Sequence, residues 1–95
     1  MRIFTHRTLL QYATKHRDAA EPLEFWYRIT KRATWDHLPA VRGVFPHADA
    51  AGKYTVFNIK GNKYRLITEI NFAKGFVFVR AFLTHAEYDR EDWQE

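Results

Sequence analysis

The sequence predicts an α+β domain in which two helices pack on one face of an antiparallel sheet. Two segments with different hydrophobic patterns lead to this prediction. Residues 5–33 place apolar side chains at helical spacing, whereas residues 54–83 alternate apolar with polar side chains or run apolar, as strands do. The predicted order of elements is β-α-α-β-β-β-α. Ninety-five residues are enough for one modest hydrophobic core, so residues 1–95 are expected to form a single domain.

The first third of the chain contains a short strand and the two helices. Residues 1–4 have the pattern of a strand, and Thr5 is expected to cap the first helix. Asp18 and Pro22 mark the start of the second helix. The predicted apolar faces consist of Leu9, Tyr12 and Ala13 in the first helix and of Phe25, Trp26, Ile29 and Ala33 in the second. Residues 36–53 contain two prolines and two glycines and are expected to be an irregular connection.

A hairpin is predicted about the turn sequence "KGNK". If Gly61 and Asn62 form a two-residue loop, Asn58 pairs with Arg65, and directly opposed residues share a face. One face then carries Phe57, Ile59, Tyr64 and Leu66, and the other carries Asn58, Lys60, Lys63 and Arg65. Like charges opposed on one face are unfavourable. This cationic face is therefore either a solvated outer surface or a phosphate site, for which a planar guanidinium flanked by ammonium and amide groups is well suited.

The sequence leaves two registers open for the second hairpin. A loop of Lys74 and Gly75 places Arg80 opposite Glu69, where the two would form an ordinary ion pair. A three-residue loop, residues 73–75, instead brings His85 opposite Lys63 and onto the face of Arg65. The strand between them, "FVFVRAFL", is apolar on both faces and is expected to be buried within the sheet.

His85 and Tyr88 follow directly on this last strand, where a short helix over residues 86–93 is expected. A histidine changes charge near neutral pH, and a tyrosine hydroxyl can donate or accept a hydrogen bond. A purely structural interpretation also exists, in which Thr84 caps the helix and Glu87 completes a capping box. That interpretation explains Thr84 and Glu87, but it requires neither His85 nor Tyr88.

The chain is basic and contains no cysteine. Residues 1–83 hold 14 Lys and Arg against six Asp and Glu, whereas residues 84–95 hold one Arg against five acids. Such an excess of positive charge attracts polyanions. The alternative is a solvated basic surface that only keeps a small protein soluble. Without cysteine there is neither a disulfide framework nor a thiolate nucleophile. The remaining histidines, His6, His16, His37 and His47, lack the spacing of metal ligands, so no metal and no cofactor are expected.

The location is predicted from what the sequence lacks. Arg2, His6 and Arg7 precede any long apolar run, so nothing resembles a signal peptide. No stretch approaches the length of a membrane span. We therefore expect a cytoplasmic protein that has no membrane partner.

Three segments make the chain similar to a known family: "WYRITKRATW", "VFPHADAAGKYTVFNIKGNKYRLI" and "VRAFLTHAEYD". Together they resemble the HigB toxins of bacterial type II toxin–antitoxin systems, which are part of the wider RelE-like superfamily. The resemblance runs from about Leu23 to Asp89, and its most specific parts are "VFNIKGNKYRL" and "THAEYD". It implies a compact RelE-like fold, which agrees with the predicted order of elements.

The resemblance also implies an mRNA interferase, an endoribonuclease that cuts messenger RNA, commonly on translating ribosomes, and thereby stops growth. It implies a HigA-type antitoxin, which binds the toxin and, through a helix-turn-helix, its own operator DNA. By position, Arg65 matches the arginine of the family's second hairpin strand, His85 falls where such toxins place a catalytic basic residue, and Tyr88 matches their C-terminal aromatic residue. These three are therefore the predicted catalytic residues. Arg65 would stabilise the phosphorane, while His85 and Tyr88 would share proton transfer. Contacts to the RNA are assigned to Asn58, Lys60, Asn62 and Lys63, although several relatives carry Lys or Arg near the position of Asn58.

An alternative interpretation assigns the same fold to a protein that catalyses no reaction. Some RelE-like relatives, the ParE group, poison DNA gyrase instead of cutting RNA, so a non-catalytic toxin or an RNA-binding module is the alternative. The paired "GNKYR" and "THAEYD" segments favour the nuclease. A surface that only inhibits another protein does not need an arginine, a histidine and a tyrosine together.

Overall fold

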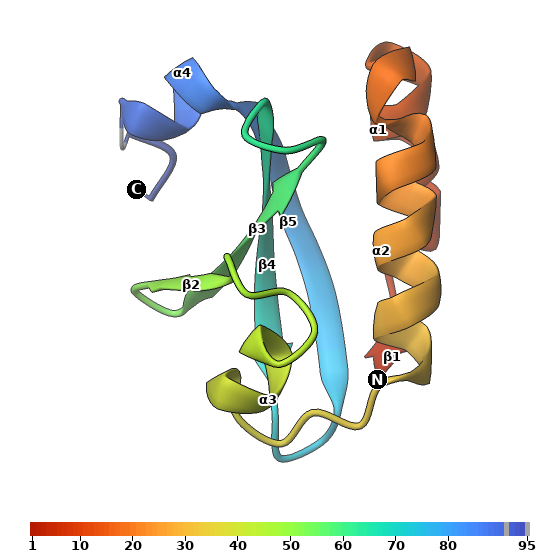
Figure 1. Ribbon diagram of the computed structural model, residues 1–95, viewed down its shortest axis with the longest axis vertical. Helices are drawn as coiled ribbons and strands as arrows, with labels where there is room; N and C mark the ends of the chain where they lie inside the picture. The colour runs from red at the N-terminus through yellow and green to blue at the C-terminus, as the bar shows by residue number, and fades with distance from the viewer. Residues whose placement is uncertain (91, 95) are drawn as a thin grey trace.

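The computed structural model describes residues 1–90 and 92–94. The chain forms a five-stranded sheet with two long helices along one face (Figure 1). The strands are β1 (Arg2–Ile3), β2 (Asp49–Ala51), β3 (Tyr54–Ile59), β4 (Tyr64–Asn71) and β5 (Phe76–Thr84). The helices are α1 (His6–Lys15), α2 (Ala20–Arg32), α3 (Leu38–Arg42) and α4 (His85–Asp89), with 3₁₀ turns at Arg17–Ala19 and Asp92–Gln94. This is the α+β architecture that the sequence predicts.

The strands lie in the order β1-β5-β4-β3-β2. The predicted antiparallel arrangement holds for β2 to β5, but β1 runs parallel to β5 and makes the sheet mixed. The backbone N–H of Arg2 donates to the carbonyl of Gly75 at 2.8 Å, and that of Phe4 donates to Val77 at 3.3 Å. These partners are more than 70 residues apart in the chain, so no local pattern could have indicated their pairing.

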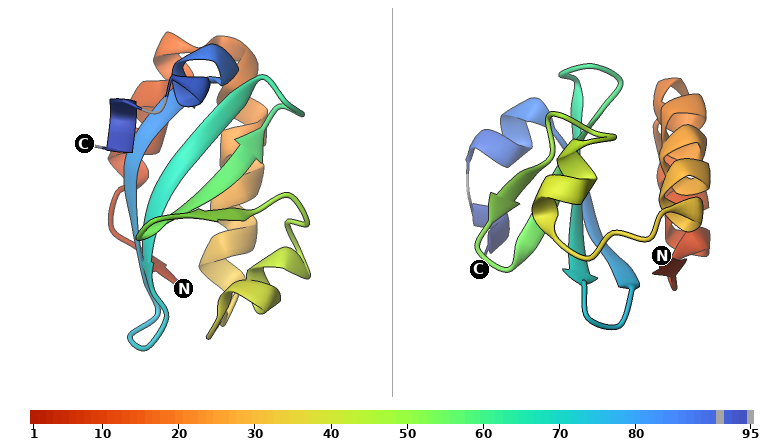
Figure 2. Two further views of the ribbon diagram at one scale, coloured as in Figure 1. Left: turned by 90° about the vertical axis from the view of Figure 1, so that its left-hand side faces the viewer. Right: turned by 60° about the horizontal axis from the view of Figure 1, so that its bottom comes forward.

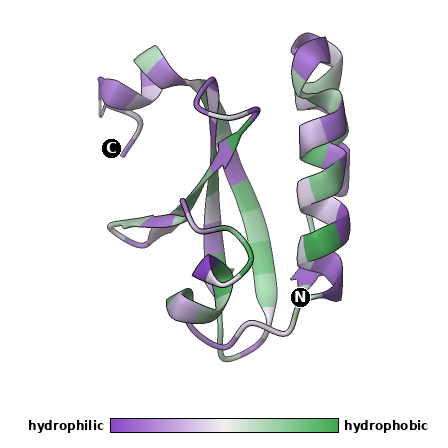
Figure 3. Cartoon of the chain, viewed as in Figure 1, coloured by the Kyte–Doolittle hydropathy of each residue, from purple (hydrophilic) through white to green (hydrophobic). Residues whose placement is uncertain are grey.

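The core lies between the helices and the sheet. Leu9 of α1 and Leu23 and Trp26 of α2 are buried against Phe57 and Leu66 of the sheet. The rings of Trp26 and Phe57 meet edge to face with their centroids 5.4 Å apart, a favoured aromatic geometry. Strand β5 is hydrophobic over most of its length, as Figure 3 shows. The buried side chains of β5 hold this strand in place, and its last residue, Thr84, is followed directly by α4.

Two helical details differ from the sequence prediction. Phe25 is 52 % exposed, because it neighbours the buried Trp26 and successive helical residues point in directions about 100° apart. Thr5 precedes α1 but does not cap it, since its hydroxyl accepts a hydrogen bond from the N–H of Val79 at 3.0 Å. Thr5 therefore ties the start of α1 to the sheet. In the part of the chain that the structure describes, no helix is both long and apolar enough to cross a membrane.

The segment expected to be irregular contains two short elements. Helix α3 has a proline in its first turn, where a missing N–H costs nothing, and strand β2 turns into β3 through Gly52, whose φ is 61°. Strand β2 pairs only with residues 54–56 of β3. Both elements lie on the β3 side of the sheet (Figure 2). Elements of three and five residues are too short to give a readable period, which is why the sequence did not reveal them.

Candidate active site

The first hairpin has the predicted register. Asn58 pairs with Arg65, Ile59 pairs with Tyr64, and the N–H of Lys63 donates to the carbonyl of Lys60 at 3.2 Å to close the turn. Gly61 has the expected left-handed backbone, with a φ of 62°, and Lys60 shares it with a φ of 54°. The face of β3 and β4 that was predicted to be apolar is buried against the helices. Arg65 accordingly lies on the opposite face.

The second hairpin contains a β-bulge. The register that would place Arg80 opposite Glu69 does not form, because Glu69 pairs with Phe78, whereas the register that brings His85 opposite Lys63 holds beyond the bulge. Neither predicted loop forms, because Asn71 pairs with Phe76 and the loop has four residues, 72–75. The register then shifts beside Arg80, which becomes the extra residue on β5. Beyond the shift, Tyr64 pairs with Thr84.

Both contacts that the two registers predicted are present as a result. Nε of Arg80 donates to Oε1 of Glu69 at 3.2 Å, which is the expected ion pair. The N–H of His85 donates to the carbonyl of Lys63 at 3.0 Å, so His85 lies beside the first hairpin as the other register required. The bulge therefore brings the "THAEYD" segment to Arg65.

Arg65 is the centre of the candidate site. Its Nη1 donates to the carbonyls of Asn62 and Tyr64 at 3.1 and 3.2 Å, and its Nη2 donates to Oδ1 of Asn62 at 2.6 Å. Nη2 also lies 3.3 Å from Nδ1 of His85. The guanidinium carbon is 5.6 Å from the ring centroid of Tyr88, within the range of a cation–π contact. The structure thus brings together the three residues predicted to be catalytic.

The charge of Arg65 is buried without a counter-ion among the described residues. Only 9 % of this residue is exposed. Its hydrogen bonds to the described residues go to uncharged oxygens of Asn62 and Tyr64, and the remaining close partner is Nδ1 of His85. A buried charge is costly unless it is paired. A guanidinium held in this way is well placed to attract an anion.

His85 is the first residue of α4, and the predicted capping box forms around it. Oγ1 of Thr84 accepts from the N–H of Glu87 at 3.2 Å, and Oε1 of Glu87 accepts from the N–H of Thr84 at 2.9 Å. This second bond lowers the pKa of Glu87. Since Thr84 and Glu87 supply the cap, the ring of His85 is not needed for it. The ring instead contacts Arg65 on one side and Asp89 on the other, with Nε2 2.8 Å from Oδ2 of Asp89.

An aromatic row extends the site from α4 to β3. The ring of Tyr88 stacks on that of Trp93 with centroids 5.1 Å apart, and Nε1 of Trp93 donates to the carbonyl of Tyr88 at 2.9 Å. The ring of Tyr54 in β3 also contacts that of Trp93, with centroids 5.8 Å apart. Sequence reasoning missed Trp93 and Tyr54, because they are 39 positions apart and follow no shared period. It also missed Asp89, although the spacing of four residues from His85 on a helix was a usable signal.

Lys60 and Lys63 do not join Arg65 on its face as predicted. Nζ of Lys63 donates to the carboxylate of Asp18 in the turn before α2, and Nζ of Lys60 is 3.7 Å from the same carboxylate. Long side chains at a hairpin tip can bend to the nearest opposite charge. Hydrogen bonds from Lys63 and then from Tyr64 lower the pKa of Asp18 to about 2. The basic tip of the hairpin is therefore linked to the helix layer.

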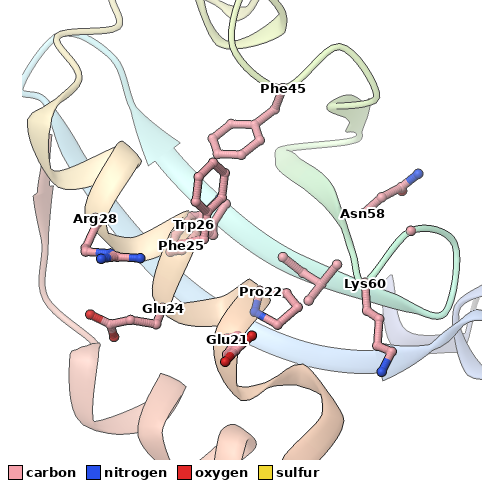
Figure 4. Close-up of a pocket in the computed structure, with 11 residues that line it drawn as sticks. Glu21, Pro22, Glu24, Phe25, Trp26, Arg28, Phe45, Asn58 and Lys60 are labelled. Carbon is pink, nitrogen blue, oxygen red and sulfur yellow. The ribbon is translucent and has the colours of Figure 1, made fainter.

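The two asparagines proposed to contact RNA also occupy different places. Asn62 holds Arg65 through both its side-chain and its backbone oxygen. Asn58 lines a groove of about 700 Å³ between α2 and the hairpin, together with Phe25, Phe45 and Lys60 (Figure 4). Figure 4 shows the aromatic rings of α2 and of Phe45 gathered on one side of this groove and Asn58 and Lys60 on the hairpin side. Of the four, Asn62 accepts hydrogen bonds from the guanidinium of Arg65, whereas Asn58 is its partner in the strand pairing.

The arrangement can stabilise negative charge and move protons. The guanidinium of Arg65 lies beside both an imidazole and a phenol ring, and these groups can act at a phosphate without a metal ion. Among the described residues, no group of three His, Asp or Glu side chains is arranged to bind a metal ion.

Fold and site together place the protein among the RelE-like toxic components of toxin–antitoxin systems, and the HigB toxin family model that carries this description matches residues 19–91. This match spans more than half of the chain, and the protein belongs to the HigB toxin family.

Two curated relatives are similar over nearly the whole chain. The mRNA interferase HigB of Escherichia coli O6:H1 strain CFT073 is 31% identical over 93 residues, which cover 95% of this chain and 90% of that protein. The mRNA interferase toxin HigB of Escherichia coli strain K12 is 26% identical over 92 residues, which cover 94% of this chain and 88% of that protein.

Proposed function

We propose that the protein is an mRNA interferase, a metal-independent endoribonuclease that cuts messenger RNA and so inhibits translation and growth. Membership of the HigB family and the names of its relatives support this proposal. The observation that carries it is the buried guanidinium of Arg65, whose described hydrogen-bond acceptors are neutral and which touches His85 and Tyr88. A partner-binding surface without chemistry gives no reason to bury a cation beside these two groups.

The proposed reaction is an attack of the RNA on its own backbone. A base removes the proton of a 2′-hydroxyl, and this oxygen forms a bond to the adjacent phosphorus. Arg65 stabilises the negative charge of the phosphorane, as preorganised cations do in poorly hydrated sites. The bond from phosphorus to the 5′-oxygen then breaks, and that oxygen receives a proton. His85 and Tyr88 share the two proton transfers. The products are a 2′,3′-cyclic phosphate and a 5′-hydroxyl.

The hairpin supplies the contacts that hold the RNA. Lys60 and Lys63 bind backbone phosphates by exchanging the carboxylate of Asp18 for the polyanion, since their side chains are 47% and 56% exposed at the hairpin tip. Asn58 adds an amide contact to the RNA from the groove between α2 and the hairpin. Asn62 acts through Arg65, whose guanidinium it orients by two hydrogen bonds.

The proposal includes the partners that such a toxin requires. The substrate is messenger RNA on translating ribosomes, which places the protein in the cytoplasm. A HigA-type antitoxin with a helix-turn-helix neutralises the toxin and connects it to operator DNA. An adjacent short open reading frame that encodes a helix-turn-helix protein would support this part of the proposal.

Primer extension on a defined transcript tests the proposed activity. The transcript is incubated with the protein in a reconstituted translation mixture, with and without ribosomes, and cleavage is expected at discrete positions when ribosomes are present. The 5′ ends of the downstream fragments should be hydroxyls, which a polynucleotide kinase labels without prior phosphatase treatment. Growth arrest without any cut in the transcript would instead favour a non-catalytic toxin that inhibits a protein partner.

A further inference from the structure

The ring of His85 has a different partner on each of its nitrogens. Nε2 lies 2.8 Å from Oδ2 of Asp89, one helical turn further along α4. Nδ1 lies 3.3 Å from Nη2 of Arg65 and 3.3 Å from the carbonyl oxygen of Asn62. Among the residues that the structure describes, the charged groups that face the ring are thus Arg65 of β4 and Asp89 of α4. The ammonium group of the adjacent Lys63 is turned to Asp18.

These partners decide which nitrogen carries the proton. An ionised carboxylate only accepts hydrogen bonds, so Nε2 is the protonated nitrogen when it faces Asp89. In a neutral ring Nδ1 then has a free lone pair, and the guanidinium of Arg65 can donate to it. Once Nδ1 has taken a proton, it can donate in turn to the carbonyl of Asn62 at the same distance. Both charge states of His85 are therefore accommodated without moving the ring.

Without Asp89 the opposite tautomer has the better partners. A proton on Nδ1 would be donated to the carbonyl of Asn62, and the free lone pair would lie on Nε2, on the side of the ring away from Arg65. We infer that Asp89 is a positioning residue that holds His85 in the tautomer whose Nδ1 can accept a proton beside Arg65. This inference rests on the proposed nuclease function and adds a fourth residue to its site.

The contribution of Asp89 to folding is expected to be small. The side chains of His85 and Asp89 are 42% and 60% exposed, and exposed ion pairs on helices contribute little to stability. The capping box of Thr84 and Glu87 holds the start of α4 independently of this pair. If a variant without Asp89 stays folded but loses activity, the loss is therefore caused by a change in the orientation or tautomer of the His85 ring.

The test compares Asp89→Asn and Asp89→Ala with the wild type in single-turnover cleavage of a ribosome-bound transcript. We expect the rate constant to fall roughly tenfold to hundredfold, the loss typical when an outer partner that orients a metal-bound histidine is removed. The concentration of substrate at half-saturation should change little, because Asp89 orients His85 and does not hold the RNA.

Asp36→Asn is the matched control, since Asp36 also pairs with a histidine, His37, on an exposed surface outside the site. This variant should cleave as the wild type does. A wild-type rate in Asp89→Asn, together with an inactive His85→Ala, would overturn the inference and leave the proposed function standing. Full activity of His85→Ala would overturn both. A loss of activity in the Asp89 variants that matches a loss of folded protein, or a weaker half-saturation with an unchanged rate constant, would also overturn the inference.

Discussion

The hydroxyl of Tyr64 donates a hydrogen bond of 2.8 Å to Oδ1 of Asp18, and the two residues are 46 positions apart in the sequence. Nζ of Lys63 donates to the other oxygen of the same carboxylate. These bonds connect the turn before α2 with the first residue of β4, and the next residue of that strand is Arg65. The helix layer therefore helps to fix the hairpin from which the candidate site is built.

The first prediction concerns acid stability. The pKa of Asp18 is lowered to about 2, well below the ordinary value of about 3.9. A carboxyl whose folded pKa is lowered stabilises the protein above its ordinary pKa, and this contribution is lost as the pH falls through the folded pKa. The difference in unfolding free energy between the wild type and Asp18→Asn should therefore shrink between about pH 4 and about pH 2. Urea titrations at a series of pH values measure it, with Asp36→Asn as the exposed control. A constant difference would contradict the prediction.

The second prediction concerns the basic hairpin tip. Lys60→Glu combined with Lys63→Glu should weaken binding to RNA or ribosomes, because fewer counter-ions are released. The slope of log affinity against log salt should fall by roughly 0.7 for each phosphate contact that is lost. Filter binding at several salt concentrations measures this slope. Lys31→Glu with Lys74→Glu makes the same charge change away from the hairpin tip, and an equal effect in both double variants would mean that net charge alone matters.

The sequence was sufficient for the two main helices, for three strands and for the first hairpin, for physical reasons. Periods of 3.6 and two residues follow directly from burial on one face, and these gave α1, α2, β3 and β4, whereas β5 was evident as an apolar run. The "KGNK" turn gave the register that pairs Asn58 with Arg65. The parallel pairing of β1 with β5, by contrast, depends on packing between distant parts of the chain, and local sequence patterns do not predict it.

The candidate site was only partly predictable. The β-bulge at Arg80 decides that His85 reaches Arg65, and a single extra residue in an apolar strand leaves no distinct sequence pattern. The pairing of Lys60 and Lys63 with Asp18 depends on how the helix layer lies over the hairpin. Both lysines lie in the turn beyond the last strand pair, where alternation no longer applies, and alternation could not show where their flexible side chains end.

The third prediction concerns chelation. Because the proposed chemistry uses a guanidinium, an imidazole and a phenol, cleavage should continue in excess EDTA. Ribosomes need Mg²⁺, so this measurement uses an isolated RNA oligonucleotide at high protein concentration and follows its fragments on a gel. Loss of cleavage with chelator and its recovery with added Mg²⁺ would contradict the mechanism.

The fourth prediction concerns Arg65, His85 and Tyr88. Arg65→Lys keeps the positive charge but loses the forked donors that bind Asn62, so it should disable cleavage at least as strongly as Lys63→Ala. His85→Ala should reduce the rate by roughly 10²–10⁴, as the loss of a positioned base typically does. Its stability should stay close to that of the wild type, because Thr84 and Glu87 still form the capping box. Unfolding of His85→Ala would instead make His85 a structural residue.

Tyr88→Phe separates the two roles that Tyr88 could have in the site. It keeps the ring that faces Arg65 and stacks on Trp93, and it removes only the hydroxyl. If the hydroxyl transfers a proton, the rate should fall by roughly 10²–10⁴ while the affinity for RNA is unchanged. Tyr54→Phe is the control, because it removes a hydroxyl from the other ring that meets Trp93 and should leave the rate unchanged. Full activity of Tyr88→Phe would show that only the ring is needed, and the proton transfers would then be assigned to His85.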